Sequence, residues 1–134
     1  MNMATSINRT DDETIEQEIQ RKGKTAPRVT PGDIEAAIVD EVYFTAEQGY
    51  QAAMKAAHPD AEAQGNQFPY STLGLLTFCV LVLRNGFTVT GESACASPEN
   101  FDAEIGRKIA RQNAVAKIWP LEGYALKQRL HDAA

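Results

Sequence analysis

The sequence predicts an α+β fold: an N-terminal helix, a small antiparallel β-sheet with a central hairpin, and two C-terminal helices. The strongest observation is an apolar run over 75–83, followed by Arg84-Asn85-Gly86 and the alternating segment 87–90. Asn-Gly between two such runs indicates a β-hairpin whose two central residues have positive φ. A second observation is that Thr30-Pro31 and Ser97-Pro98, one on each side of the hairpin, are typical of helix starts.

Length and composition predict one domain. The chain has 134 residues, of which 43% are hydrophobic and 23% charged, and its formal net charge is -5. This charge argues against a protein that coats DNA. No run reaches the roughly 18 apolar residues of a membrane span, and the N-terminus lacks the apolar core of a signal peptide. We therefore expect a cytoplasmic protein that binds neither membranes nor DNA.

The first 29 residues are polar, and we expect a flexible tail over 1–29 before a single domain over 30–134. Ile15 and Ile19 are four residues apart and favour a helical stretch from Thr10 to about Arg21. This stretch has too little apolar surface to be held alone. The tail is therefore expected to be disordered, or ordered only by a partner subunit.

A short helix is expected over 31–40, with Thr30 as its N-cap. The β-branched and aromatic residues 42–45 predict a strand. Residues 48–70 are rich in Ala, Gln and Gly, and they predict a long loop excursion with a helical turn over 52–57.

The C-terminal part predicts two helices packed on the sheet as a helical hairpin. The first is expected to begin at Ser97-Pro98 and to run to about Trp119, since Pro120 prevents the ordinary continuation. The second is expected over 121–130. Gly91, between the hairpin and these helices, is expected to mark a bulge or a strand end.

The sequence contains no recognisable catalytic arrangement. His58 and His131 have contexts typical of exposed side chains, so no base is marked beside a nucleophile. Cys79 and Cys95 lack the spacing of a zinc site or a disulfide framework, and we expect reduced, buried thiols. No metal-ligand spacing or phosphate loop is found. The prediction is a binding or interaction protein, not an enzyme, with no metal and no cofactor.

One group of residues is suited to an anionic ligand. Arg107 and Arg111 are four apart on a predicted helix, so both guanidinium groups are expected to point the same way and clamp phosphate oxygens. The backbone donors at Ser97-Pro98 favour anions, and Phe87 can stack a base. The arginines equally fit a solvated helix face, and Phe87 equally fits the core. Spacing alone leaves both interpretations open.

Short motifs follow one another along the chain in a specific order: Thr30-Pro31-Gly32-Asp33, Asn85-Gly86-Phe87, Ser93-Ala94-Cys95, Asn100-Phe101-Asp102 and Trp119-Pro120-Leu121-Glu122-Gly123-Tyr124. Together they resemble the small phage protein family first noted in phages N4 and Sf6. The resemblance covers roughly 28–130, and the tail and the 48–70 excursion fall outside it.

This family is similar to the type-one Thoeris anti-defence sponges. These phage proteins bind cyclic ADP-ribose isomers made by bacterial TIR-domain sensors and do not cleave them. The resemblance implies an N-terminal anchoring helix, a β-core and a C-terminal helix-turn-helix. It also implies homodimers with ligand pockets at the subunit interface, or hexamers (trimers of dimers) that hold cyclic trinucleotides of CBASS signalling. The implied function is inhibition of Thoeris immunity in the bacterial cytoplasm.

By position, the resemblance implies that Phe87 stacks on the adenine of the ligand. It also implies that Ser97, just before the Pro98-Glu99-Asn100 motif, contacts a ribose or phosphate, with Asn100 beside it. Some family members have Asn where this chain has Ser97, whose hydroxyl has a different reach. Helix geometry, and not the resemblance, makes Arg107 and Arg111 the candidates for a pyrophosphate.

Two other functions are alternatives to a sponge. One is an accessory protein that inhibits a host protein through its acidic surface or its N-terminal tail, including Asp11, Asp12 and Glu13. The other is an enzyme that hydrolyses a cyclic nucleotide, and the missing base and metal ligands count against it.

Overall fold

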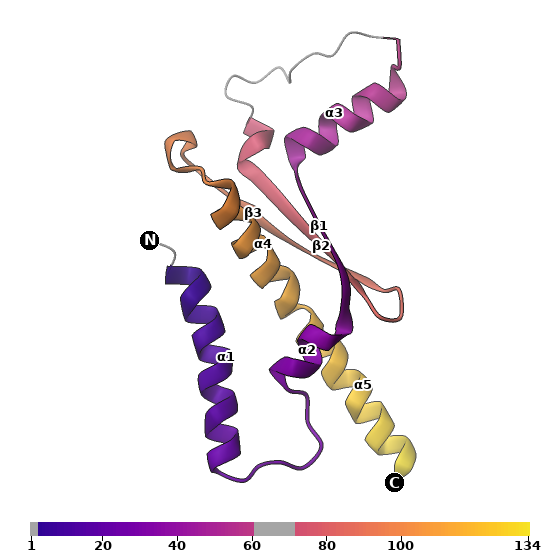
Figure 1. The fold of residues 1–134 in the computed structure, drawn as a ribbon. Helices are drawn as coiled ribbons and strands as arrows, with labels where there is room; N and C mark the ends of the chain where they lie inside the picture. Colours follow the sequence, from indigo (N-terminus) through magenta and orange to yellow (C-terminus); the bar gives the residue numbers. More distant parts are fainter. Residues whose placement is uncertain (1–2, 61–71) are drawn as a thin grey trace.

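The computed structural model describes the backbone of residues 3–60 and 72–134, and the side chains of 11–60 and 72–134. Its elements, in chain order, are α1 (Met3–Arg21), α2 (Pro31–Ala37), β1 (Ile38–Thr45), α3 (Ala46–Ala57), η1 (Thr72–Leu75), β2 (Leu76–Leu83), β3 (Thr88–Ala94), η2 (Pro98–Asn100), α4 (Ala103–Ala116) and α5 (Ile118–Ala133). The helices pack beside an antiparallel sheet (Figure 1). The predicted α+β class is therefore confirmed.

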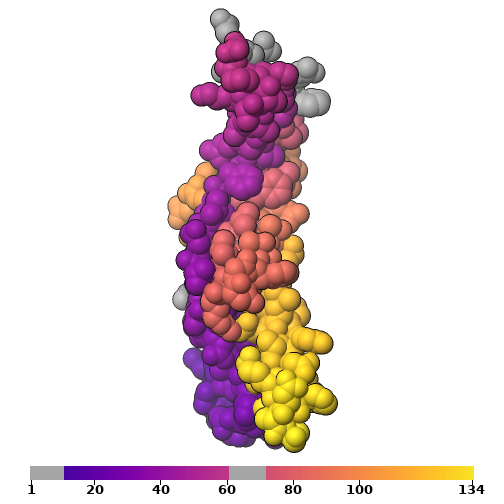
Figure 2. All heavy atoms as spheres, turned by 90° about the vertical axis from the view of Figure 1, so that its right-hand side faces the viewer, coloured from indigo at the N-terminus to yellow at the C-terminus, as the bar shows by residue number. Residues whose placement is uncertain are grey.

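The molecule is elongated. Figure 2 shows α3 at one end and α5 at the other, with the hairpin between them. In Figure 1, α4 crosses the sheet, α1 lies beside α4, and α5 continues beyond the sheet. No helix of the described residues is long and apolar enough to cross a membrane.

The sheet has three antiparallel strands in the order β1-β2-β3, so β2 is central. Val80 on β2 pairs with Val42 on β1 and with Thr90 on β3. The predicted strand over 42–45 begins earlier, at Ile38, and its register shifts between Ile38 and Asp40. The first part of β1 contains charged residues, which are unfavourable in strands. The sequence therefore did not predict this extension.

The hairpin is confirmed, but its turn differs from the prediction. Gly86 donates its backbone N–H to Leu83 O at 2.8 Å, and Leu83 N donates to Phe87 O at 2.8 Å. The loop therefore holds three residues, Arg84 to Gly86. Gly86, the last residue of this loop, has a positive φ of 89°. This is a three-residue loop ending in a left-handed glycine, rather than a two-residue turn with two positive φ angles.

One face of the sheet packs on α4 through small residues. Gly106, Ala110 and Ala114 recur every fourth position and are buried against β2 and β3. Gly91 lies inside β3, paired with Cys79, and a Cβ there would collide with the backbone of Ala110 and Ala114. The expectation that Gly91 marks a bulge or strand end was wrong. Gly91 lies within β3, and its lack of a side chain leaves room for α4 to pack against the strand.

The buried core lies between this sheet face and the helices α2, α4 and α5. Its hydrophobic members in the described part of the chain are Ile34, Ala37, Cys79, Leu81, Leu83, Val89, Ala110, Ala114 and Ile118. The alternation along β2 places one set of side chains here and the other set on the opposite face.

The opposite face of the sheet, which we call the open face, is also apolar. It carries half-buried side chains from β2 and β1: Leu76, Phe78, Val80, Val82 and Phe44. Val42 is 43% exposed at its centre. The helix α3 reaches this face at the end where Gly49 faces the Phe44 ring. The open face thus offers apolar surface for a partner.

Two helices near the sheet have different bounds from those predicted. The helix capped by Thr30 ends at Ala37 and not at Asp40, because Ala37 O accepts the backbone N–H of Arg84 as β1 begins. The predicted loop excursion over 48–70 is helical in its first part, which belongs to α3, and the helical turn expected over 52–57 lies within that helix. A capping box between Thr45 and Gln48 starts that helix. Residues 61–70 of the excursion lie outside the described residues.

Residues 3–21 of the segment that was expected to be a flexible tail form the helix α1. The predicted helical stretch from Thr10 to Arg21 is present, and it extends back to Met3. A bidentate pair holds α1 to the chain that follows, with Arg28 donating to both carboxylate oxygens of Glu16 at 2.7 and 2.6 Å. The hydrogen bond from Arg28 lowers the pKa of Glu16 to about 2. This pair joins α1 to the segment that leads into α2, and α1 also contacts α4.

The two C-terminal helices form one bent rod and not a helical hairpin. Lys117, the residue between α4 and α5, keeps a helical backbone with φ -78° and ψ -17°, so the chain does not reverse (Figure 1). Pro120 is the third residue of α5. The first four N–H groups of a helix have no partner within it, so proline is tolerated there.

Candidate functional site

The hairpin tip presents Phe87 to solvent. Its ring is 56% exposed, which excludes the core position that its sequence context also allowed. The backbone N–H of Phe87 donates to Asn85 Oδ1 at 3.0 Å, and Gly86 supplies the left-handed backbone between them. The turn therefore fixes the start of the strand behind the ring, and the ring is free for a base to stack on.

Arg84 is the first residue of the same turn, and it was not among the predicted site residues. Its side chain is 52% exposed, and Nη2 donates to Glu122 Oε1 of α5 at 2.9 Å. Arg84 directly precedes Asn85-Gly86, and this position at the turn could have identified it as a site residue. A cation and an aromatic ring thus share the hairpin tip.

Ser97 and Asn100 lie at the other end of β3, beyond Ala94. Ser97 is half-buried and Asn100 is exposed. Cys95 Sγ and Asn100 N both donate to the backbone oxygen of Ser97, at 3.2 and 3.0 Å. The Ser97 side chain makes no capping hydrogen bond.

The prediction that α4 begins at Ser97-Pro98 was wrong. Only the short η2 begins there, and α4 begins at Ala103. Asp102 caps α4, and its Oδ1 accepts the backbone N–H of Ile105 at 3.0 Å. Because a carboxylate already occupies the positive end of this helix, the anion site expected from free backbone donors is replaced by the protein's own charge.

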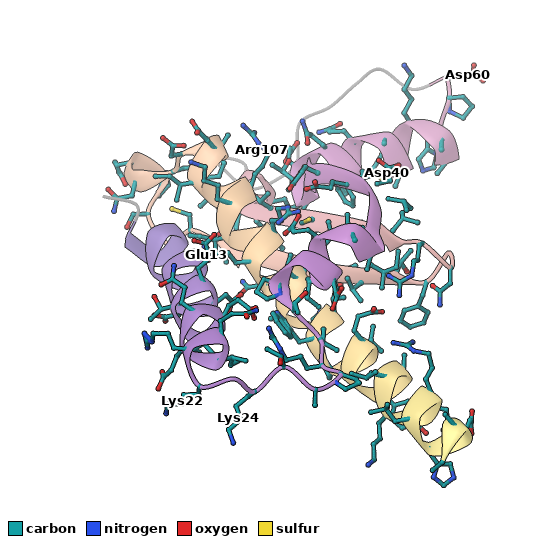
Figure 3. The ribbon with its side chains drawn as sticks, turned by 60° about the horizontal axis from the view of Figure 1, so that its bottom comes forward. Glu13, Lys22, Lys24, Asp40, Asp60 and Arg107 are labelled. Atoms are coloured by element: carbon teal, nitrogen blue, oxygen red, sulfur yellow. The ribbon has the colours of Figure 1, made fainter. Side chains whose placement is uncertain are left out.

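The two arginines of α4 have different surroundings. Arg107 projects from α4, is exposed, and has no hydrogen-bond or ion-pair partner in the described part of the chain (Figure 3). The guanidinium of Arg111 is bound within the fold by Glu35 and Glu41. The pair predicted from their spacing therefore offers one free guanidinium, that of Arg107.

The contacts of Arg111 join three elements. Its Nη1 and Nη2 donate to the two carboxylate oxygens of Glu35 on α2, at 3.1 and 2.9 Å. Its Nε donates to Glu41 Oε1 on β1 at 2.8 Å, and Tyr43 Oη donates to the same oxygen at 2.8 Å. Arg111 thereby fastens α2 and β1 to α4.

The pKa values of this cluster follow its hydrogen bonds and burial. The bond to Glu35 raises the pKa of Arg111, and the bond from Arg111 lowers the pKa of Glu41. Burial, followed by the bond to Glu41, raises the pKa of Tyr43. Burial raises the pKa of the Cys79 thiol. The cluster holds Glu41 ionised and Tyr43 and Cys79 protonated, which suits a structural contact.

We expect Arg111→Gln to destabilise the protein by about 1–2 kcal/mol at neutral pH, because three charge-assisted hydrogen bonds are lost at a partly exposed site. The folded-state pKa of Glu41 lies below its usual 4.5, so its contribution is present above that pH and is lost as the pH falls through the folded value. Urea unfolding of both proteins at several pH values measures the difference, which should shrink below about pH 4.

Arg107→Gln is the matched control for this experiment, since it removes the same charge from the same helix without removing a partner in the described residues. Its stability should match the wild type within about 0.5 kcal/mol. A stability difference for Arg111→Gln that grows in acid would contradict the assigned role of Glu41.

The remaining predicted residues lie apart from these ends. His58 and His131 are exposed, as expected. Both cysteines are free; Cys79 is buried, while Cys95 is only half-buried, unlike the prediction. Among the side chains of residues 11–60 and 72–134, no group of three His, Cys, Asp or Glu residues is placed to hold a metal ion.

The comparison with known proteins agrees with the order of motifs along the chain. Residues 29–130 match the Phage protein (N4 Gp49/phage Sf6 gene 66) family. The matched residues include the sheet, the hairpin tip, η2, α4 and most of α5. No curated protein and no solved structure matches the chain. Because the match extends over most of its length, this chain belongs to the phage N4 Gp49/Sf6 gene 66 protein family.

Proposed function

We propose that this protein is a phage or prophage anti-defence protein that sequesters signalling nucleotides and does not cleave them. Its ligand is a cyclic ADP-ribose isomer, or a cyclic trinucleotide of CBASS signalling, and its effect is inhibition of Thoeris immunity in the bacterial cytoplasm. The protein needs no cofactor for this, since binding alone lowers the free concentration of the signal. The dissociation constant must lie well below the threshold of the effector.

The observation that carries the proposal is the exposed Phe87 ring on a turn that is held by its own hydrogen bonds. A large aromatic side chain that is 56% exposed contributes little to the core, and its flat face suits stacking with adenine. Family membership also supports the proposal. The resemblance of this family to the sponges implies that the aromatic residue directly after Asn85-Gly86, which is Phe87, stacks on the adenine.

The proposed ligand contacts lie at opposite ends of β3. Phe87 precedes β3, whereas Ser97, Asn100 and Arg107 follow it. A strand of this length spans about 20 Å, so one nucleotide cannot touch both groups of the same chain. We therefore propose a homodimer, or a hexamer made of three dimers, in which Phe87 of one copy faces Ser97, Asn100 and Arg107 of another.

The open face favours a second candidate function. Apolar side chains, including Val42 and Val80, line this face, and Asp11, Asp12 and Glu13 expose acidic charge on α1. Both features suit a protein partner. The second candidate is therefore an accessory protein that inhibits a host protein by direct contact.

Recovery of an intact ligand tests the first proposal. The purified protein is incubated with a panel of cyclic ADP-ribose isomers and cyclic trinucleotides, unbound ligand is removed by filtration, and the retained protein is heat-denatured. Chromatography of the released material should give unaltered nucleotide in a fixed ratio to protein. A chemically altered nucleotide would identify an enzyme and overturn the sponge.

Retention of no nucleotide would overturn the sponge and favour the direct inhibitor. In that case, neutralising Asp11, Asp12 and Glu13 together should abolish inhibition of the host protein. A sponge should tolerate the same change, because α1 carries none of the proposed ligand contacts.

A further inference from the structure

The hairpin tip carries a cation whose orientation is fixed from two sides. The backbone N–H of Arg84 donates to Ala37 O at 2.9 Å, which ties the first turn residue to the end of α2. Its Nη2 donates to Glu122 Oε1 at 2.9 Å, and the Glu122 side chain is only 15% exposed. The tip of a hairpin, usually a mobile element, is therefore anchored to both helices beside it.

This anchoring leaves most of the guanidinium available. Of the five N–H groups of an arginine, the contact with Glu122 uses one. Nε and Nη1 of Arg84 have no partner within the described ranges, and the side chain remains 52% exposed. An oriented guanidinium with free N–H groups is suited to bind phosphate oxygens.

Arg84 is also close to the stacking ring. It lies three residues from Phe87, so their Cα atoms are at most about 11 Å apart. In an adenine nucleotide the base and its phosphate are joined through a single ribose. A base stacked on Phe87 therefore carries a phosphate within the range of a long arginine side chain on the same turn.

The arginines of α4 do not serve this turn within one chain. The guanidinium of Arg111 is bound by two carboxylates. Arg107 is next to Gly106, which faces Thr77 near the start of β2, at the end of the sheet opposite the hairpin. The cation beside the base-stacking ring is Arg84.

We propose that Arg84 binds a phosphate of the adenine nucleotide whose base stacks on Phe87, with Glu122 positioning its guanidinium. This inference rests on the proposed function, and it identifies the phosphate contact of that site. It also assigns a role to the Arg84 and Glu122 pair beyond stability, since an exposed ion pair contributes little to folding.

Three single variants test the proposal: Arg84→Gln, Glu122→Gln and Arg129→Gln. Arg129 is an exposed arginine of α5 and serves as the matched control. Calorimetric titration uses the cyclic ADP-ribose isomer that the wild type retains. Arg84→Gln should weaken binding about 10–100-fold, because a charge-assisted hydrogen bond to phosphate is lost. Glu122→Gln should weaken binding by a smaller factor, about 3–10-fold, because the guanidinium remains but loses the carboxylate that orients it. Arg129→Gln should stay within about threefold of wild type.

A purely structural ion pair predicts a different pattern. Arg84→Gln and Glu122→Gln would then lower the melting temperature equally and change affinity equally, which would overturn the proposal. Wild-type affinity in Arg84→Gln would overturn it as well. Failure of the wild type to retain any nucleotide is a separate result, which refutes the proposed function and this inference together.

Discussion

Gly91→Ala is expected to destabilise the fold by about 3 kcal/mol or more. The added Cβ would lie closer to Ala110 O and Ala114 N than real Cβ atoms come to any atom. Both are backbone atoms of α4, so no side chain can rotate away. The helix must move off β3, which opens the core around Ala110 and Ala114.

Gly123→Ala is the matched control, because it makes the same chemical change where an added Cβ meets no atom within 4 Å. Gly123 lies inside α5, and alanine there should stabilise the protein by about 0.5–1 kcal/mol. Urea unfolding followed by circular dichroism measures both variants. Equal midpoints for Gly91→Ala and wild type would show that α4 does not approach β3 through this glycine.

Phe87→Ala is expected to lose most of the nucleotide affinity while the fold stays intact. Stacking of a base on an aromatic ring contributes about 1–3 kcal/mol, which corresponds to a loss of roughly 5–150-fold in affinity. The ring is 56% exposed, so its removal should change the free energy of unfolding by no more than about 0.5 kcal/mol. Calorimetric titration and urea unfolding of the same preparation separate the two effects.

Tyr124→Ala provides the comparison for this result. Tyr124 is a 75% exposed aromatic residue of α5 and has no assigned ligand contact, so its removal should leave affinity unchanged. Equal loss in both variants would indicate a general effect of surface aromatics. An unfolded Phe87→Ala protein would mean that the ring supports the turn and that the stacking surface lies elsewhere.

Much of the fold followed from local patterns. The apolar run of β2 and the Asn85-Gly86 turn predicted the hairpin, and the Thr30 cap predicted the start of α2. These signals involve residues that are close in sequence, so the chain's own neighbours determine them. The number of residues in the turn was not predictable, because Asn-Gly fits both a two-residue and a three-residue loop.

Other elements were not determined by the local sequence alone. The helix α1 is held in part by Glu16 and Arg28, twelve residues apart. The bend between α4 and α5 reflects Pro120 in the first turn of a helix, where it is tolerated, whereas the sequence equally allowed a reversal. In each case the local signal was compatible with more than one structure.

For the candidate site, the sequence by itself determined the residue types: an aromatic ring after an Asn-Gly turn and arginines four apart on a helix. The tertiary structure decided which of them are free. Arg111 is bound by Glu35 and Glu41, which lie 76 and 70 positions away in the sequence. Arg84 is held at the hairpin tip by Glu122, which lies 38 positions away. Periodicity reports the direction of a side chain on its own helix or strand, but only packing determines which charges it meets.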